Sequence, residues 1–99
     1  MERPGSLLEL AESLLKSSFT GDQSVSRVNV INARGGQGHA LEPQRRRVAE
    51  GWQLLEHAGL ICRDPDDRRG DGWFLTGAGR TALSGGDVQG SIILRVPGL

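Results

Sequence analysis

The stretch that decides the fold runs from residue 43 to residue 83 and reads PQRRRVAEGWQLLEHAGLICRDPDDRRGDGWFLTGAGRTAL. At its start Val48, Trp52 and Leu55 recur at positions i, i+4 and i+7, which predicts an amphipathic helix over residues 43–58. Pro43 suits the first helical position because the N–H group that proline lacks would be unbonded there. Gly59 suits the left-handed residue that ends a helix. In such a Schellman cap the following Leu60 would contact Leu55.

A β-hairpin over residues 60–75 follows this helix. Two short apolar runs, 60–63 and 73–75, flank a polar loop rich in aspartate, proline and glycine, which is typical of a hairpin. Trp73 and Phe74 point to opposite faces of the return strand. We expect Phe74 to lie inside, together with Cys62 as a small buried group. Thr76 can cap a last short helix over residues 77–84.

The N-terminal part predicts one clear helix and one ambiguous segment. Ser6 and Glu9 fit a capping box at the start of a helix over residues 6–17. Residues 22–34 allow two interpretations. Asp22 could cap a helix that stops at Gly35, or residues 27–33 could form a short strand, because β-branched residues and asparagines disfavour a helix. We prefer the helix because the predicted fold requires one here.

The C-terminal part follows a break at Gly85 and Gly86. Ile92, Ile93 and Leu94 lie in an apolar run that predicts a strand over residues 91–96. We therefore expect one folded domain over residues 1–84 and a glycine-rich tail over residues 85–99. Such an apolar tail would pack on the core, pair with another chain or be frayed.

Composition limits the classes of protein. The chain has 99 residues, with twelve basic and twelve acidic side chains and a formal net charge of +0. A nucleic acid would therefore have to bind a local basic patch rather than the whole molecule. The single cysteine allows no internal disulfide, and we expect a reducing, cytoplasmic compartment. We see no signal peptide, and no apolar run reaches the roughly 20 residues that cross a membrane.

Three motifs in residues 43–83 resemble the winged helix-turn-helix proteins of bacteria. Leu55-Glu56-x-x-Gly59-Leu60-Ile61 is similar to the end of the recognition helix in MarR-type regulators. Asp66-Asp67-Arg68-Arg69 is similar to their wing, and Leu75-Thr76-x-x-Gly79-Arg80 to the step into the next helix. The resemblance extends less closely to residues 6–34. It implies an α+β fold of the winged-helix kind, a scaffold that hosts both DNA-binding proteins and protein-interaction modules.

Two departures argue against a complete MarR-type, ligand-sensing repressor. Such regulators have extra terminal helices that build a dimer, and 99 residues leave little room for them. The segment 35–41 is also longer than the usual turn of a helix-turn-helix. Its glycines lack the spacing of a phosphate-binding loop, and we interpret it as a flexible connector.

Two polar clusters are the candidate sites. Arginines occupy positions 45–47, in the first turns of the predicted recognition helix, where such helices contact base edges. At the hairpin tip two further arginines could grip phosphate, although aspartates at 64, 66, 67 and 71 oppose this. The predicted double-stranded DNA-binding residues are Gln44, Arg45, Arg46, Arg47, Arg68 and Arg69.

We therefore expect a small DNA-binding protein of the winged-helix kind, such as a transcriptional regulator. Its neutral charge predicts modest affinity for DNA as a monomer, and hence a homodimer or a place in a larger complex. The alternative is a protein-interaction module or adaptor, bound to its partner through the Trp73 face or the tail 91–96, or a fragment of a larger effector. His39, His57 and Cys62 match no zinc-binding spacing, and no nucleophile lies in a signature context. We therefore expect no enzyme activity, no metal and no cofactor.

Overall fold

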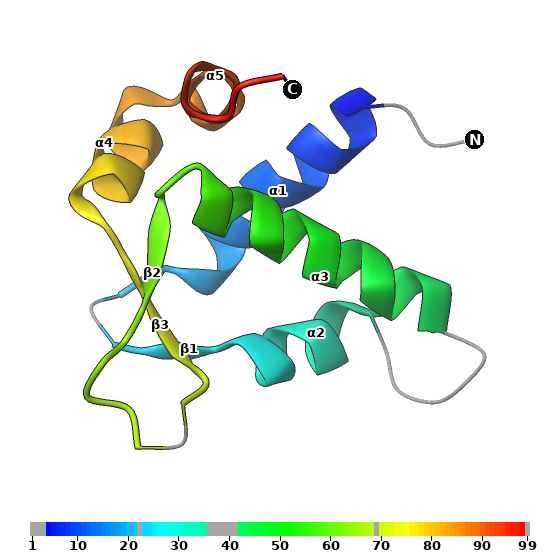
Figure 1. Ribbon diagram of the computed structural model, residues 1–99, viewed down its shortest axis with the longest axis vertical. Helices are drawn as coiled ribbons and strands as arrows, with labels where there is room; N and C mark the ends of the chain where they lie inside the picture. Colours follow the sequence, from blue (N-terminus) through cyan, green and yellow to red (C-terminus); the bar gives the residue numbers. More distant parts are fainter. Residues whose placement is uncertain (1–3, 22, 36–41, 69, 99) are drawn as a thin grey trace.

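A computed structural model describes residues 4–21, 23–35, 42–68 and 70–98 of the chain. These residues form an α+β fold, as predicted, in which a small antiparallel sheet lies at one side of a group of helices (Figure 1). The arrangement is compatible with a winged helix. Its elements, in chain order, are α1 (Pro4–Ser18), β1 (Val25–Ser26), α2 (Arg27–Gly35), α3 (Glu42–His57), β2 (Ile61–Arg63), β3 (Gly72–Leu75), α4 (Gly77–Gly85) and α5 (Val88–Arg95).

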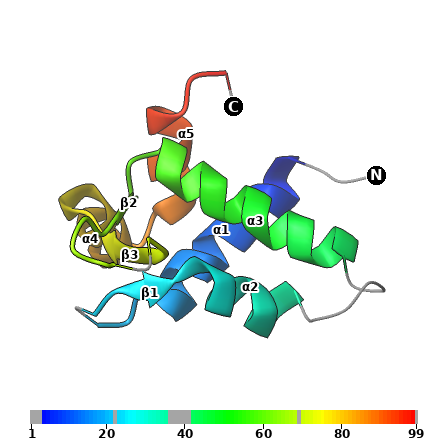
Figure 2. The same cartoon turned by 60° about the horizontal axis from the view of Figure 1, so that its bottom comes forward.

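The first helix is confirmed, but it begins at Pro4, so Ser6 lies inside it rather than before it. Neither interpretation of residues 22–34 holds alone. A two-residue strand, β1, leads directly into α2 (Figure 2). The chain passes from strand to helix at Ser26. The Ser26 hydroxyl accepts a hydrogen bond from the backbone N–H of Asn29 at 3.2 Å, as the side chain of an N-cap residue does. The proposed cap at Asp22 and the connector over 36–41 lie outside the described residues.

The core forms where α1 crosses α3 beside the sheet. Gly51 of α3 permits close contact, because a Cβ added there would lie 3.0 Å from Leu14 Cδ1. Trp52, predicted to lie in the core, is 1% exposed. Its ring centroid lies 5.5 Å from that of Phe19 and 5.8 Å from that of Trp73. Such tilted and edge-on aromatic pairs add to the stability gained from burial.

The sheet has the strand order β1-β3-β2, and its register overturns one prediction. Trp73 is buried and Phe74 is only partly buried, the reverse of what we expected. Phe74 pairs with Cys62 across the hairpin, whereas Ile61 pairs with Leu75. Paired residues share one face of a sheet, so Phe74 and Cys62 lie together on the outer face. Cys62 is accordingly exposed, and its predicted burial is wrong.

The junction between α3 and the hairpin follows the sequence prediction closely. Gly59 has a φ of 72° and donates its N–H to Glu56 O at 2.9 Å, while Leu60 N donates to Leu55 O at 3.1 Å. These two bonds define a Schellman cap. Thr76 caps α4, as predicted, by accepting from the N–H of Gly79 at 3.0 Å.

The predicted strand over 91–96 is wrong, because these residues belong to the helix α5 and the turn after it. Asp87 caps α5 by accepting a hydrogen bond from Gly90 N at 3.0 Å. Val88 and Ile92, four residues apart, are both fully buried in the common core. The segment after residue 85 therefore packs on the same core as α1 and α3. None of the described helices is long and apolar enough to cross a lipid bilayer.

Candidate nucleic-acid interface

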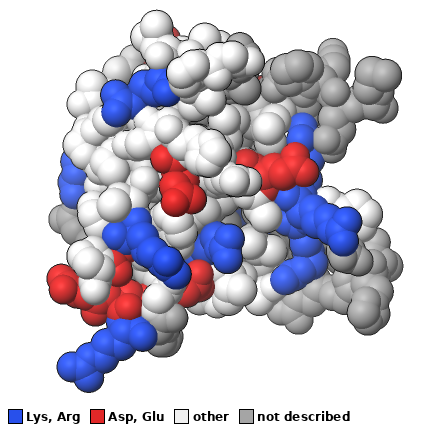
Figure 3. Space-filling model, viewed as in Figure 1, with Lys and Arg blue, Asp and Glu red and all other residues white. Residues whose placement is uncertain are grey.

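The predicted site residues that the structure describes come from two places, the N-terminal turns of α3 and the loop between β2 and β3. In the view of Figure 1, α3 lies in front, α2 runs below it and the β2–β3 loop lies at the lower left. Figure 3 shows the charges on this face. Basic side chains gather over the N-terminal end of α3, and acidic ones gather over the β2–β3 loop. The two clusters of the sequence analysis are therefore present on one face, but at opposite ends.

The arginine run at 45–47 does not act as a single patch, because consecutive helical side chains point about 100° apart. Arg45 is half-buried and donates from its Nη1 atom to Asn32 Oδ1 at 2.6 Å, which joins α3 to α2. Arg47 has a side chain only 17% exposed, with its Nη1 3.6 Å from Glu50 Oε2. Arg46 is exposed, as is Gln44. The three arginines thus differ: Arg46 is exposed, Arg45 joins α3 to α2, and Arg47 is largely covered and pairs within α3.

The outer face of α3 consists of Arg46, Ala49, Glu50 and Gln53. These residues line a shallow hollow of about 470 Å³. Its remaining lining residues are Arg27, Trp52 and Glu56. Sequence reasoning missed Gln53 and Arg27 as site residues. The i, i+4, i+7 spacing of Arg46, Glu50 and Gln53 could have identified the first, whereas Arg27 comes from the neighbouring helix.

The acidic loop, residues 64–71, folds its carboxylates back onto the protein. Asp71 Oδ2 accepts hydrogen bonds from the Ser26 hydroxyl at 2.6 Å and from Val28 N at 3.1 Å, at the start of α2. A carboxylate at this position is favoured by the partial positive charge of a helix N-terminus. Asp64 accepts from the hydroxyl of Ser24, and Asp67 accepts from Asp71 N at 3.1 Å.

These hydrogen bonds change the interpretation of the acidic loop as a surface that only repels DNA. Asp64 and Asp71 anchor the hairpin loop to β1 and α2, so their first role is structural. Arg63, which sequence reasoning did not select, also serves the loop, because its Nε donates to Gly70 O at 3.0 Å. Arg68 is exposed at the tip. The other predicted tip residue, Arg69, lies outside the described residues.

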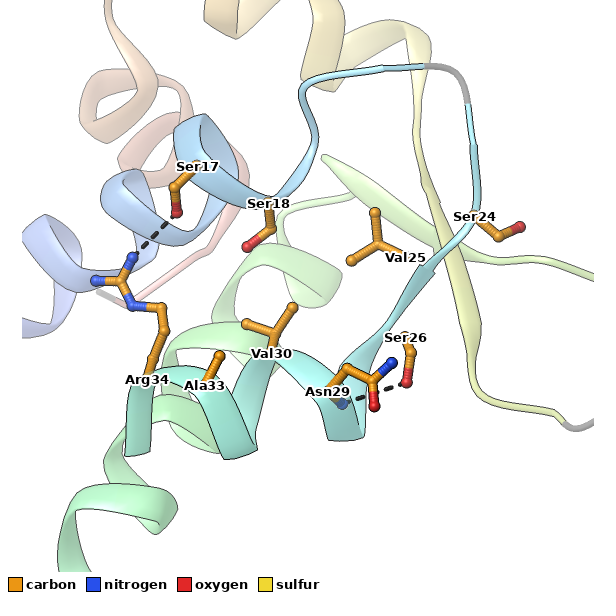
Figure 4. A pocket seen from close by; sticks show the side chains of 9 residues that line it. All are labelled: Ser17, Ser18, Ser24, Val25, Ser26, Asn29, Val30, Ala33 and Arg34. Carbon is orange, nitrogen blue, oxygen red and sulfur yellow. Dashed lines mark hydrogen bonds between the residues drawn. The ribbon is translucent and has the colours of Figure 1, made fainter. Parts of the chain in front are cut away.

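A second hollow, of about 440 Å³, lies between the end of α1 and α2 (Figure 4). In that view Arg34 of α2 reaches toward Ser17 of α1. Its Nη1 donates to Ser17 Oγ at 3.0 Å and its Nη2 donates to Ser13 Oγ at 2.9 Å. The Ser17 hydroxyl in turn donates to Ser13 O at 2.7 Å. The guanidinium group of Arg34 therefore connects α2 to α1, and we assign no ligand to this hollow.

Within the described ranges, no three histidine, cysteine or acidic side chains gather closely enough to hold a metal ion. His57 is exposed at the end of α3, and His39 falls outside those ranges. Elsewhere, on α1, a hydrogen bond from Gln89 and then one from Lys16 lower the pKa of Glu12 below its usual 4.5.

No protein-family model matches the chain, and neither a curated protein nor a solved structure was found to match it. The functional assignment must therefore come from the geometry and chemistry of the described residues.

Proposed function

We propose that this chain is a winged helix-turn-helix protein of bacterial type that binds double-stranded DNA in the cytoplasm, as a small regulator of transcription. In this proposal α3 is the recognition helix and the β2–β3 hairpin is the wing. The order of the elements supports it. Two helices precede α3, β1 joins the hairpin as a third strand, and α3 ends directly at the wing.

The observation that carries the proposal is the exposure of Arg46 and Gln44 on the first turns of α3, a helix whose inner side is held by α1 and α2. An arginine at this position can donate two hydrogen bonds to guanine or to a phosphate. Arg68 on the wing supplies a second cation at the far end of the same face. Arg45 contributes indirectly, because its bond to Asn32 positions α3 against α2.

Salt-dependent binding tests this function. The dissociation constant for a mixed-sequence duplex is measured by fluorescence anisotropy at several salt concentrations, for the wild-type chain and for Arg68→Ala, which removes the exposed cation of the wing. Each phosphate contact contributes about 0.9 to the log–log slope, so loss of one contact should reduce the slope by about that amount. Arg80→Ala, which removes an exposed arginine from α4, should leave the slope unchanged. Absence of salt dependence, or an unaltered Arg68→Ala slope, would contradict the proposal.

The alternative function is a protein-interaction module, and α5 provides the observation that favours it. Ile93 and Leu94 are 51% and 88% exposed, an unusual state for large apolar side chains next to each other. The other surface predicted for a protein partner lies around Trp73. Trp73 is buried, so its side chain offers a partner little surface. A neutral DNA-binding chain would also gain affinity as a dimer, so the two functions are compatible.

Sedimentation measurements test the contribution of α5. If α5 forms the contact between two copies, the wild-type chain should sediment as a dimer at micromolar concentration. A double change of Ile93 and Leu94 to serine should then give a monomer with unaltered helix content. A wild-type chain that remains monomeric at all concentrations would contradict the homodimer.

A further inference from the structure

The outer face of α3 has a balanced charge. Four charged side chains line its hollow, Arg27, Arg46, Glu50 and Glu56, and two positive and two negative charges sum to zero. Such a surface gains little by approaching a phosphate, because attraction and repulsion oppose each other. It can still form hydrogen bonds with groups that carry no net charge. Base edges in the major groove are such groups.

Gln53 lies on this face between the two acidic residues, and it is exposed. Ala49 lies four residues before it, so the two side chains are neighbours on the helix surface. A glutamine carboxamide forms two hydrogen bonds with adenine N6 and N7, and an alanine methyl contacts the thymine methyl. An A·T pair presents these two features side by side in the major groove. Gln53 and Ala49 together therefore match one A·T pair.

Arg46 lies seven residues before Gln53, which is nearly two full helical turns. The two side chains share one side of α3 and are separated by about 10.5 Å along its axis. A base-pair step is about 3.4 Å, so a helix lying along the groove would place them about three base pairs apart. A guanine is the base that best receives an arginine in that position.

We propose that Gln53 and Ala49 read one A·T pair in the major groove and that Arg46 reads a guanine about three base pairs away. This inference rests on the proposed DNA binding and adds the sequence that the site prefers. The exposed carboxylate of Glu50, 3.6 Å from Arg47, lies between the two reading positions. The negative charge of Glu50 repels a phosphate group at this point. The outer face of α3 would therefore contact base edges rather than the DNA backbone.

The experiment selects preferred duplexes from a randomised pool, using the full chain. Affinities are then measured for the best duplex and for two modified forms of it. In one form uracil replaces the thymine of the A·T pair that Gln53 and Ala49 would read, and in the other 7-deazaadenine replaces the adenine of that pair. The protein variants are Gln53→Ala and Gln53→Arg. Gln23→Ala is the matched control, because Gln23 is an exposed glutamine in the turn between α1 and β1. Thermal unfolding of each variant verifies that it folds.

Gln53→Ala should weaken binding to the best duplex about 5- to 150-fold, and binding to an unrelated duplex much less. Removal of the thymine methyl should cost about fourfold in affinity. Gln53→Arg should shift the selected base from adenine to guanine, and Gln23→Ala should change nothing. Equal weakening of all duplexes by Gln53→Ala, or selected sites without a fixed A·T pair, would overturn this inference alone. A wild-type chain that binds no duplex would overturn the proposed function and this inference with it.

Discussion

The arginine run at 45–47 and the acidic loop at 64–71 are both short polar clusters on the same face, yet they use their charges differently. In the arginine run Arg46 is exposed, Arg45 joins α3 to α2, and the largely covered Arg47 pairs with Glu50 within α3. In the acidic loop the carboxylates of Asp64 and Asp71 turn inward and hold the loop against β1 and α2. A run of like charges in a sequence therefore predicts a charged surface only when the direction of each side chain is known.

Of the variants that test this comparison, Asp71→Ala should have the largest effect on the free energy of unfolding. The change removes the acceptor for the Ser26 hydroxyl and for Val28 N at the start of α2. Loss of a helix cap and of a second hydrogen bond should lower the free energy of unfolding by about 1–3 kcal/mol. Urea unfolding at neutral pH measures it.

Asp66→Ala is the control for this variant. It removes the same charge from the same loop, but Asp66 is exposed, so the free energy of unfolding should change by less than about 0.5 kcal/mol. Equal losses in the two variants would mean that the net charge of the loop matters more than its bonds.

A smaller effect is expected from the arginine run. Arg47→Ala removes a side chain whose stem is largely covered, and it should lower the free energy of unfolding by about 1–2 kcal/mol. Arg46→Ala should lower it by about 0.5 kcal/mol or less, because Arg46 is exposed. The same urea titration compares them. The division of the run would be disproved if Arg46→Ala destabilised the fold as much as Arg47→Ala.

The smallest effect concerns a third carboxylate, Glu12, which joins α1 to α5 through the amide of Gln89 at 2.8 Å. Its folded-state pKa is lowered, first by this hydrogen bond and then by Lys16. The unfolded chain therefore binds this proton more readily. The stability that Glu12 contributes is present above its ordinary pKa of 4.5 and is lost as the pH falls through the lower folded value.

Urea unfolding between pH 7 and pH 3 measures this loss. Gln89→Ala removes the main cause of the shift, so its stability should fall less over the same pH range. Identical pH profiles for the wild-type chain and for Gln89→Ala would show that the hydrogen bond does not lower the pKa.

Local signals allowed the sequence to predict much of the fold. The helical spacing from Val48 to Leu55, the left-handed Gly59 and the capping Thr76 each act within a few residues, and all were found as predicted. The failures have nonlocal causes. The inward position of Trp73 depends on cross-strand register, and α5 owes its form to Val88 and Ile92 packing on distant helices.

The candidate site was predictable in position but not in detail. Residue type placed Arg45, Arg46 and Arg47 at the start of a helix, but only the structure shows that Arg45 contacts Asn32 of α2 and that Arg47 is largely covered beside Glu50. Asp71 and Val28 are 43 residues apart in sequence, so no local pattern could reveal their bond. Gln53 was not predicted as a site residue, because the hollow it lines forms only where α3 lies beside Arg27 of α2.

The bond from Arg95 Nε to Ala58 O, at 2.5 Å, connects the last helix to the end of α3. Together with the burial of Val88 and Ile92, it makes α5 part of the smallest unit that can fold. A chain cut after Gly85 would open the core between α1 and α3 and leave a backbone carbonyl of the α3 cap without its donor. Domain boundaries used for cloning, or tolerated by gene fusion, should therefore fall beyond residue 95.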